Sequence, residues 1–150
     1  AKMSSETTRS PPDFVGLYRR YEALSPGQKA ELRRVSAPDD LRDLPALYRL
    51  FPGQQISDKW LRVAFLLSHC CHRDGALNLG SQLAAAKINE ARLFQVVRAK
   101  EPIDLIQLRR LVFQVKPTVD WKHFGWTLLA WNKEKKRELL EDYFISKSKP

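Results

Sequence analysis

The fold is decided by residues 57–72, which read SDKWLRVAFLLSHCCH. Ser57 is one of the residue types that favour the N-cap of a helix, so a helix is expected to begin there. The residues that follow are apolar on most sides of a helix, and such a helix is stable only when other elements surround it. This stretch therefore predicts the central helix of the protein, ending near His72.

Helical periodicity and start signals continue on both sides of the central stretch. Ser25, Pro26 and Gln28 have the spacing of a capping box with proline at the first helical position. Side chains that favour N-caps precede three later apolar segments: Asn89, Asp120 and Asn132. The other expected helices span about residues 13–24, 26–35, 78–86, 89–99, 102–115, 120–131 and 132–145, with short helical segments opening at Ser36 and Asp43.

The sequence contains no strand-like alternation of useful length, so it predicts an all-α protein. We expect a compact helical bundle of about eight to nine helices. Two small halves, residues 13–77 and 78–150, are a further expectation, with the loop after Phe51 or the Asp74-Gly75 turn as the dividing feature. Residues 1–12 are rich in Ser, Thr and Pro and are expected to be disordered, with Ala1-Lys2 before Met3 resembling a cloning remnant.

Composition points to a globular protein with an anionic partner. Hydrophobic residues make up 43% of the 150 residues, which is enough for a core, and 26 Lys and Arg outnumber 17 Asp and Glu to give a net charge of +9. Such an excess attracts polyanions, which leaves nucleic acid, an anionic membrane surface and acidic protein as partners.

Composition also indicates the compartment. No window approaches the roughly 18 consecutive apolar residues of a membrane span, and the polar start lacks the apolar centre of a signal peptide. The two cysteines, Cys70 and Cys71, are adjacent, which excludes a disulfide framework and suits a reducing compartment. We therefore expect a cytoplasmic protein.

Basic residues on two expected helices are candidates for phosphate contacts. In helix 89–99, Arg92 and Arg98 lie opposite the apolar face, where forked guanidinium donors can reach phosphate oxygens. In helix 102–115, Arg110 lies in a narrow polar stripe, whereas Arg109 points into an apolar arc. A charge in that arc needs a partner. A buried ion pair, a phosphate and a partner subunit remain open for Arg109.

The last expected helix has bases at its start, contrary to the preference of the helix dipole. Lys133, Lys135, Lys136 and Arg137 crowd this end, where free backbone N–H groups can also bind an anion. One continuous helix over 120–145 is the alternative, and it would place the same residues in mid-helix. Arg33 and Arg34 end the helix that begins at Pro26, where the dipole favours cations without any ligand.

The sequence gives little indication of a metal site, a catalytic carboxylate pair or a base-stacking surface. His69-Cys70-Cys71-His72 cannot converge on one metal, because consecutive helical residues point about 100° apart. Asp39 and Asp43 lie one turn apart, but acids at a helix start are explained by the dipole alone. The Trp residues at 121, 126 and 131 are expected to be core rather than base-stacking surfaces. We therefore expect no catalytic centre, no metal and no cofactor.

Five runs carry a resemblance to a known family. They read LRRVSAPDDLRD (32–43), PALYRL (45–50), KINEARLFQ (87–95), QLRRL (107–111) and LLEDYF (139–144). In this order and spacing they resemble the small-subunit (CasB) family of the type I-E CRISPR Cascade complex. The resemblance extends from about residue 14 to about residue 146 and therefore covers most of the chain.

The resemblance implies an all-helical protein without catalytic activity. Two copies of such a protein would lie side by side in the complex, contact the other Cascade subunits and help to hold the assembly of crRNA and target DNA. A basic surface would guide the displaced non-target strand and so stabilise the R-loop, while base pairing supplies sequence specificity.

The expected nucleic-acid-binding residues combine basic positions suggested by the resemblance with the basic start of the last helix. They are Arg33, Arg34, Arg92, Arg98, Arg109, Arg110, Lys133, Lys136 and Arg137. Two other hypotheses stay open. One is a purely structural assembly subunit whose arginines dock acidic neighbours without binding nucleic acid, and the other is an unrecognised enzyme that uses Asp39 or Asp43.

Overall fold

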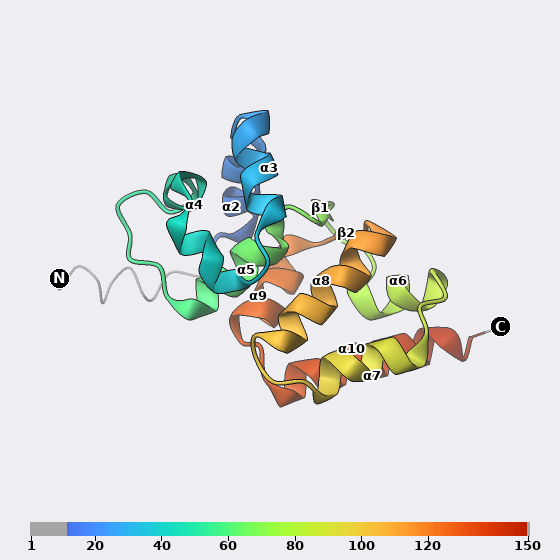
Figure 1. Cartoon of the computed structure of the whole chain (residues 1–150). Helices are drawn as coiled ribbons and strands as arrows, with labels where there is room; N and C mark the ends of the chain where they lie inside the picture. Colours follow the sequence, from blue (N-terminus) through green and yellow to red (C-terminus); the bar gives the residue numbers. More distant parts are fainter. Residues whose placement is uncertain (1–11, 150) are drawn as a thin grey trace.

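The structure is a computed structural model that describes residues 12–149. Within this range the chain forms nine α-helices, one 3-10 helix and two short strands, and Figure 1 shows the helices packed around one another. In chain order the elements are α2 (Phe14–Glu22), α3 (Pro26–Arg34), η1 (Pro38–Asp43), α4 (Pro45–Leu50), α5 (Asp58–Leu67), β1 (Cys71–His72), α6 (Leu79–Ala85), α7 (Glu90–Arg98), α8 (Ile103–Val115), β2 (Thr118–Val119), α9 (Trp121–Leu129) and α10 (Lys133–Lys147). The predicted all-α class is confirmed, and the predicted disordered segment lies outside the described residues apart from Pro12.

The central helix of the fold is α5, as predicted. Every side chain from Leu61 to Leu67 is buried, and the helix packs against η1 and α9 (Figure 1). Arg62 is the one charged member of this buried run. Its guanidinium donates to the carbonyls of Leu128 and Trp131, both at 3.2 Å, so the buried charge is hydrogen-bonded. The predicted cap at the start of α5 is not formed, because no side-chain cap hydrogen bond is present there within residues 12–149.

The chain leaves the helical conformation earlier than predicted after α5. The helix ends at Leu67, and strand β1 follows, pairing in parallel with β2. The backbone after α5 is hydrogen-bonded by residues far along the chain. The Trp121 indole, for example, donates to the Cys70 carbonyl at 3.2 Å. A two-residue strand leaves no alternation in a sequence. The expectation of a helix that reaches His72 is therefore wrong, while a pair of two-residue strands leaves the all-α class unchanged.

Most of the predicted helix starts are confirmed. The Ser25 side chain accepts from the Gln28 N–H at 3.2 Å, and the Gln28 side chain accepts from the Ser25 N–H at 3.4 Å, which completes the capping box. The other three predicted caps also accept from first-turn N–H groups: Asn89, Asp120 and Asn132. Because the Asn132 cap separates α10 from α9, the alternative of one continuous helix over 120–145 is wrong.

One core connects the early and late parts of the chain. Its cluster of buried residues includes both Leu47 and Leu128. Helix α7 packs against α8, and α10 packs against α6 and α7 (Figure 1). The division into halves at residue 77 stays a prediction. Across residues 12–149, no helix combines the length and apolarity that a bilayer crossing requires.

Candidate nucleic-acid interface

Five arginines surround one open hollow on the surface of the protein. The hollow has a volume of about 660 Å³ and is lined by Ala30, Arg33, Arg34, His69, Arg92, Arg109, Arg110 and Phe113. We call this group of residues the arginine hollow. It brings together five of the nine basic residues predicted as nucleic-acid contacts.

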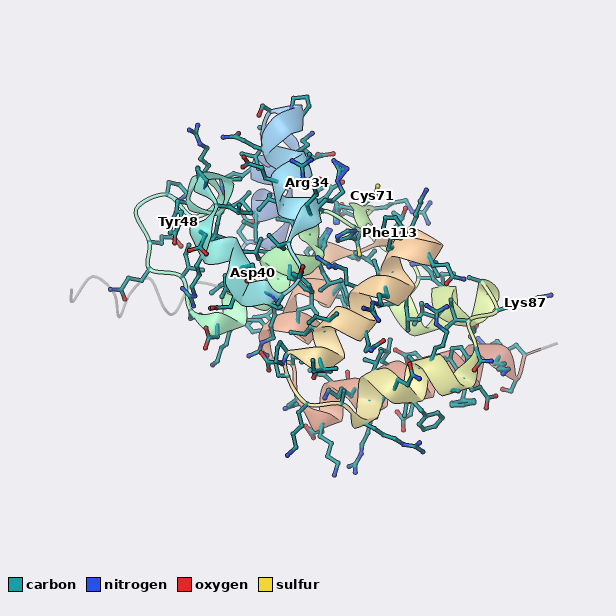
Figure 2. All side chains as sticks on the ribbon, in the orientation of Figure 1. Arg34, Asp40, Tyr48, Cys71, Lys87 and Phe113 are labelled. Carbon is teal, nitrogen blue, oxygen red and sulfur yellow. The ribbon has the colours of Figure 1, made fainter. Side chains whose placement is uncertain are left out.

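The arginines of the hollow come from α3 and from α7 and α8, two consecutive helices far from α3 in the sequence. The last turn of α3 carries Arg33 and Arg34, while Arg92 comes from α7 and Arg109 from α8. Figure 2 labels Arg34 on α3 and Phe113 on α8, which line the same hollow. A dipole role at the end of α3 does not conflict with a role in this surface, because both guanidiniums remain exposed.

Arg109 is held in place without an ion pair. Its guanidinium donates to the Val35 carbonyl and lies 4.3 Å from the centre of the Phe65 ring, a cation–π contact. Burial, with a smaller effect from the adjacent Arg110, lowers the pKa of this guanidinium. The alternative of a buried ion pair for Arg109 is therefore wrong within the described part of the chain.

Arg92 and Arg98 differ in their surroundings although both lie on α7. The Arg92 guanidinium donates to the Gln114 side chain at 2.6 Å, which fixes it at the edge of α8. The Arg98 guanidinium lies 4.9 Å from the centre of the Phe94 ring and does not line the arginine hollow. Arg98 is exposed to solvent in the last turn of α7.

The charge of the arginine hollow is not balanced by neighbours. No carboxylate lines it, and none of its five arginines forms an ion pair inside residues 12–149. Burial, followed by the charges of Arg109 and Arg33, lowers the pKa of His69 to about 4, so the imidazole is neutral at pH 7. Like charges gathered around one hollow repel one another, and a polyanion relieves that repulsion.

Lys136 lies in the interior, although the sequence suggested a phosphate contact. Its side chain is almost fully buried, and its ammonium is 2.7 Å from the Asp104 carboxylate. The ammonium also donates to the Ala99 carbonyl at 2.8 Å. The Trp131 indole donates to the same carboxylate at 3.0 Å. Lys136 thus stabilises the junction of α8 and α10 and is unavailable to a ligand.

The remaining bases at the start of α10 lie apart from the arginine hollow. Lys133 and Arg137 are exposed and form no ion pair with a described residue. Lys135 lies 3.5 Å from Glu138, an ordinary pair one turn apart. The predicted basic helix start is confirmed, but its residues have three different environments. Lys133 and Arg137 are exposed, Lys135 forms a surface pair and Lys136 lies in the core.

Sequence reasoning missed a cluster of possible metal ligands at the β1–β2 pair. His72, Asp74 and Asp120 place one ligand atom each within 4.8 Å of one another. The His72 Nδ1 accepts from the backbone N–H of Trp121 at 3.1 Å. The ring proton therefore lies on Nε2, which donates to the Asp74 carboxylate at 2.8 Å. Although burial opposes it, hydrogen bonds from the N–H groups of Gly75 and Lys122 lower the pKa of Asp120. These partners make the cluster a structural network that ties β1 to α9.

The structure also shows the surroundings of the cysteines, of Asp39 and of the tryptophans considered in the sequence. Cys70 is buried and Cys71 exposed, and both follow the end of α5 instead of lying in a helix that reaches His72. The Asp39 carboxylate pairs with Arg42 at 3.1 Å. Trp121 and Trp131 are core residues as predicted, whereas Trp126 is 48% exposed.

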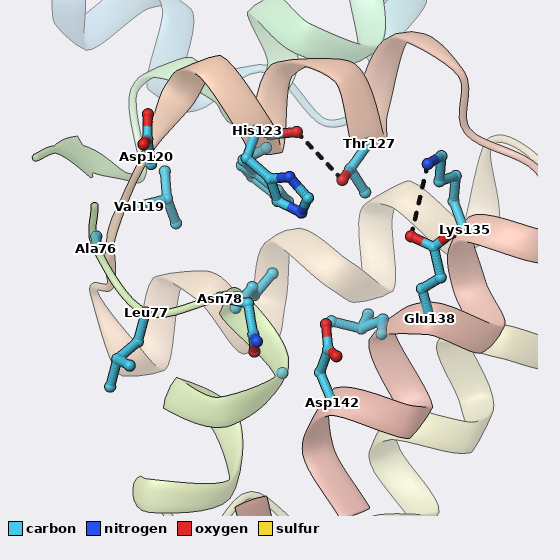
Figure 3. A pocket seen from close by; sticks show the side chains of 14 residues that line it. Ala76, Leu77, Asn78, Val119, Asp120, His123, Thr127, Lys135, Glu138 and Asp142 are labelled. Atoms are coloured by element: carbon cyan, nitrogen blue, oxygen red, sulfur yellow. Dashed lines mark hydrogen bonds and ion pairs between the residues drawn. The ribbon is translucent and has the colours of Figure 1, made fainter. Parts of the chain in front are cut away.

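A second hollow, with a volume of about 300 Å³, lies where α6, α9 and α10 meet. Figure 3 shows His123 from α9 and Lys135, Glu138 and Asp142 from α10 around it. Burial raises the pKa of Asp142. Charges of both signs line this hollow, so it lacks the attraction for polyanions that the arginine hollow has.

Comparison with known proteins places the chain in a family. The family model described as CRISPR-associated protein Cse2 matches residues 28–144. The chain is 37% identical over 153 residues to the CRISPR system Cascade subunit CasB of Escherichia coli (strain K12), covering 91% of this chain and 96% of that protein. It is also similar to a chain in the crystal structure of E. coli Cascade bound to a PAM-containing dsDNA target. That match has a TM-score of 0.82 and 39% identity, and covers 89% of this chain and 97% of the other.

The family match spans most of the described helices, from α3 to α10. The relatives match over nearly their whole length, so the fold and the family agree. The resemblance found in the five sequence runs is confirmed, and this chain belongs to the CRISPR-associated Cse2 (CasB) family of type I-E systems.

Proposed function

We propose that this chain is a non-catalytic Cascade subunit that binds the nucleic-acid backbone through the arginine hollow. The observation that carries the proposal is a set of five guanidiniums around one hollow with no carboxylate among its lining residues. The setting is supported by the relatives, one described as a Cascade subunit and one found in Cascade bound to a dsDNA target.

The proposed mechanism is electrostatic and independent of base sequence. Guanidiniums match phosphate oxygens through paired donors, and each neutralised phosphate releases counterions. In this role the hollow holds the displaced non-target strand, so the R-loop stays open beside the assembly of crRNA and target strand. Sequence specificity comes from guide pairing and not from this subunit.

The proposed partners are crRNA, target and non-target DNA, the other Cascade subunits and a second copy of this chain, all in the cytoplasm. Outside the hollow, three more predicted contacts are exposed and available to a phosphate: Arg98 on α7 and Lys133 and Arg137 on α10. We expect weak binding by the isolated protein and stronger binding in the complex, because linked contacts raise the effective concentration.

Charge reversal of Arg34 and Arg110 tests the proposal. Both are exposed, so replacement by Glu should leave the fold intact. Affinity for oligo(dT) at low salt should fall, and the log–log salt dependence should become shallower by about 0.7 for each lost phosphate contact. Fluorescence anisotropy over a salt series measures both quantities.

Arg19→Glu with Arg49→Glu is the matched control. These arginines are exposed and lie outside the arginine hollow, and the control changes the net charge by the same amount. Equal losses in the two double variants would contradict a local site. The alternative of a purely structural subunit predicts that the hollow variant fails to join the complex while the isolated wild type shows no affinity for oligo(dT).

A further inference from the structure

We infer that the arginine hollow holds an unstacked nucleotide of a single strand, with the base stacked on Phe113 and the neighbouring phosphates on the arginines. This inference rests on the proposed function and adds an aromatic contact to it. Phe113 lines the hollow and is 62% exposed, more than Tyr48 at 49% and Trp126 at 48% among the described residues.

Position on α8 places the Phe113 ring beside the charges. Phe113 follows Arg109 by four residues and Arg110 by three, so the three side chains share one face of the helix. The next residue, Gln114, accepts the hydrogen bond that holds Arg92. Sugar-phosphate groups on both sides of a bound base would therefore meet guanidiniums.

His69 supports the ring from one side. The centres of the two rings are 6.2 Å apart and the planes are inclined by 72°, an edge-on contact. Because the imidazole is neutral at pH 7, it adds no charge to the hollow and serves as an uncharged support. Phe113 is thereby held in place while much of its surface stays open to a base.

The chemistry of the surroundings favours a nucleotide over an apolar protein surface. An apolar partner that covered Phe113 would also remove the surrounding arginines from water without supplying carboxylates, which is costly. A single strand supplies an aromatic face and phosphates together, and stacking with cationic contacts is the usual basis of such binding. A volume of about 660 Å³ lies within the roughly 300–1,000 Å³ of ligand sites.

The other exposed aromatic side chains of the described chain lie elsewhere. The Tyr48 hydroxyl donates to the Arg42 carbonyl at 2.6 Å. Trp126 packs edge-on against Phe14, with ring centres 5.7 Å apart. Within residues 12–149, Phe113 is the one exposed aromatic in the arginine hollow.

Replacement of Phe113 by Ala in the full-length protein tests the inference. Affinity for oligo(dT) should fall roughly 5- to 150-fold, the range that corresponds to loss of one base–aromatic stack. The salt dependence should not change, because the phosphate contacts remain. Phe113→Tyr should restore binding and Phe113→Leu should not, since Leu keeps the apolar volume without the ring.

Two controls separate stacking from other effects. Trp126→Ala removes an exposed aromatic outside the hollow and should leave oligo(dT) affinity unchanged. An abasic strand of the same length should bind wild type and Phe113→Ala equally, because neither complex then has a base to stack.

Each contrary outcome has a distinct meaning. Wild-type affinity of Phe113→Ala for oligo(dT) would overturn the inference, and the proposed function would survive if Arg34→Glu with Arg110→Glu still weakened binding. Loss of complex assembly by Phe113→Ala with oligo(dT) binding intact would identify a protein contact instead and would also overturn the inference. Failure of the wild type to bind oligo(dT), alone and reconstituted with Cascade subunits, would overturn both proposals.

Discussion

Replacement of Lys136 by Met distinguishes a role in the fold from a role in nucleic-acid binding. The ammonium of Lys136 is 2.7 Å from the Asp104 carboxylate, and the Asp104 residue is only 1% exposed. Methionine preserves most of the side-chain length and removes the charge. The carboxylate would keep its hydrogen bond from the Trp131 indole at 3.0 Å but would have no counter-charge in the interior.

The expected destabilisation is large because one buried charge remains. Removing one partner of a buried ion pair costs about 3–5 kcal/mol, and the surviving Trp131 hydrogen bond favours the lower end, about 3 kcal/mol. In a protein of this size each kcal/mol shifts Tm by about 2–4 °C, so Tm should fall by roughly 6–12 °C. Adding Asp104→Asn removes the second charge while keeping an acceptor for the indole, and should recover most of the loss.

Thermal unfolding followed by circular dichroism measures these shifts, and oligo(dT) anisotropy is measured on the same samples below Tm. We expect Lys136→Met to unfold early and to bind oligo(dT) like wild type. Wild-type Tm together with weaker binding would refute the interior ion pair and return Lys136 to the binding surface. A double variant as unstable as the single one would show that the loss does not come from an uncompensated carboxylate.

Two further perturbations test the packing of the fold. Folding lowers the pKa of His69 from 6.5 to about 4, so the folded state disfavours the protonated imidazole and the free energy of unfolding should fall as the pH drops from 6.5 to 4. After discounting for partial exposure, His69→Phe should lose about 2 kcal/mol less of its unfolding free energy than wild type between pH 7 and pH 4. The same change in the urea-unfolding curves of both proteins over this pH range would contradict the prediction. An added Cβ at Gly80 would lie 2.7 Å from the Leu139 carbonyl oxygen, so Gly80→Ala should separate α6 from α10 and cost about 1–3 kcal/mol. Gly27→Ala is the matched control, because the atom nearest to its added Cβ is 4.0 Å away. Its free energy of unfolding, measured with urea, should stay level or rise by up to about 1 kcal/mol.

Much of the secondary structure follows from local sequence. Helix periodicity and caps depend on residues within a few positions of one another, which is why the capping box at Ser25 and the cap at Asn132 are found where the pattern predicts them. The short β1–β2 pair is missed because its paired residues, such as Cys71 and Thr118, are 47 positions apart (118 − 71) and its strands are too short to show alternation.

By itself, the sequence determined the helical class, the central place of α5, the net charge of +9 and the family, since these depend on composition, periodicity and ordered motifs. Tertiary structure alone decided which basic residues can meet a ligand. Lys136, expected at the surface, is paired inside with Asp104, whereas Arg109, a candidate for a buried ion pair, lines the open arginine hollow. The physical reason is that a basic side chain is neutralised only when an acidic side chain from another helix comes within a few ångströms of it. Periodicity along one helix carries no information about such partners.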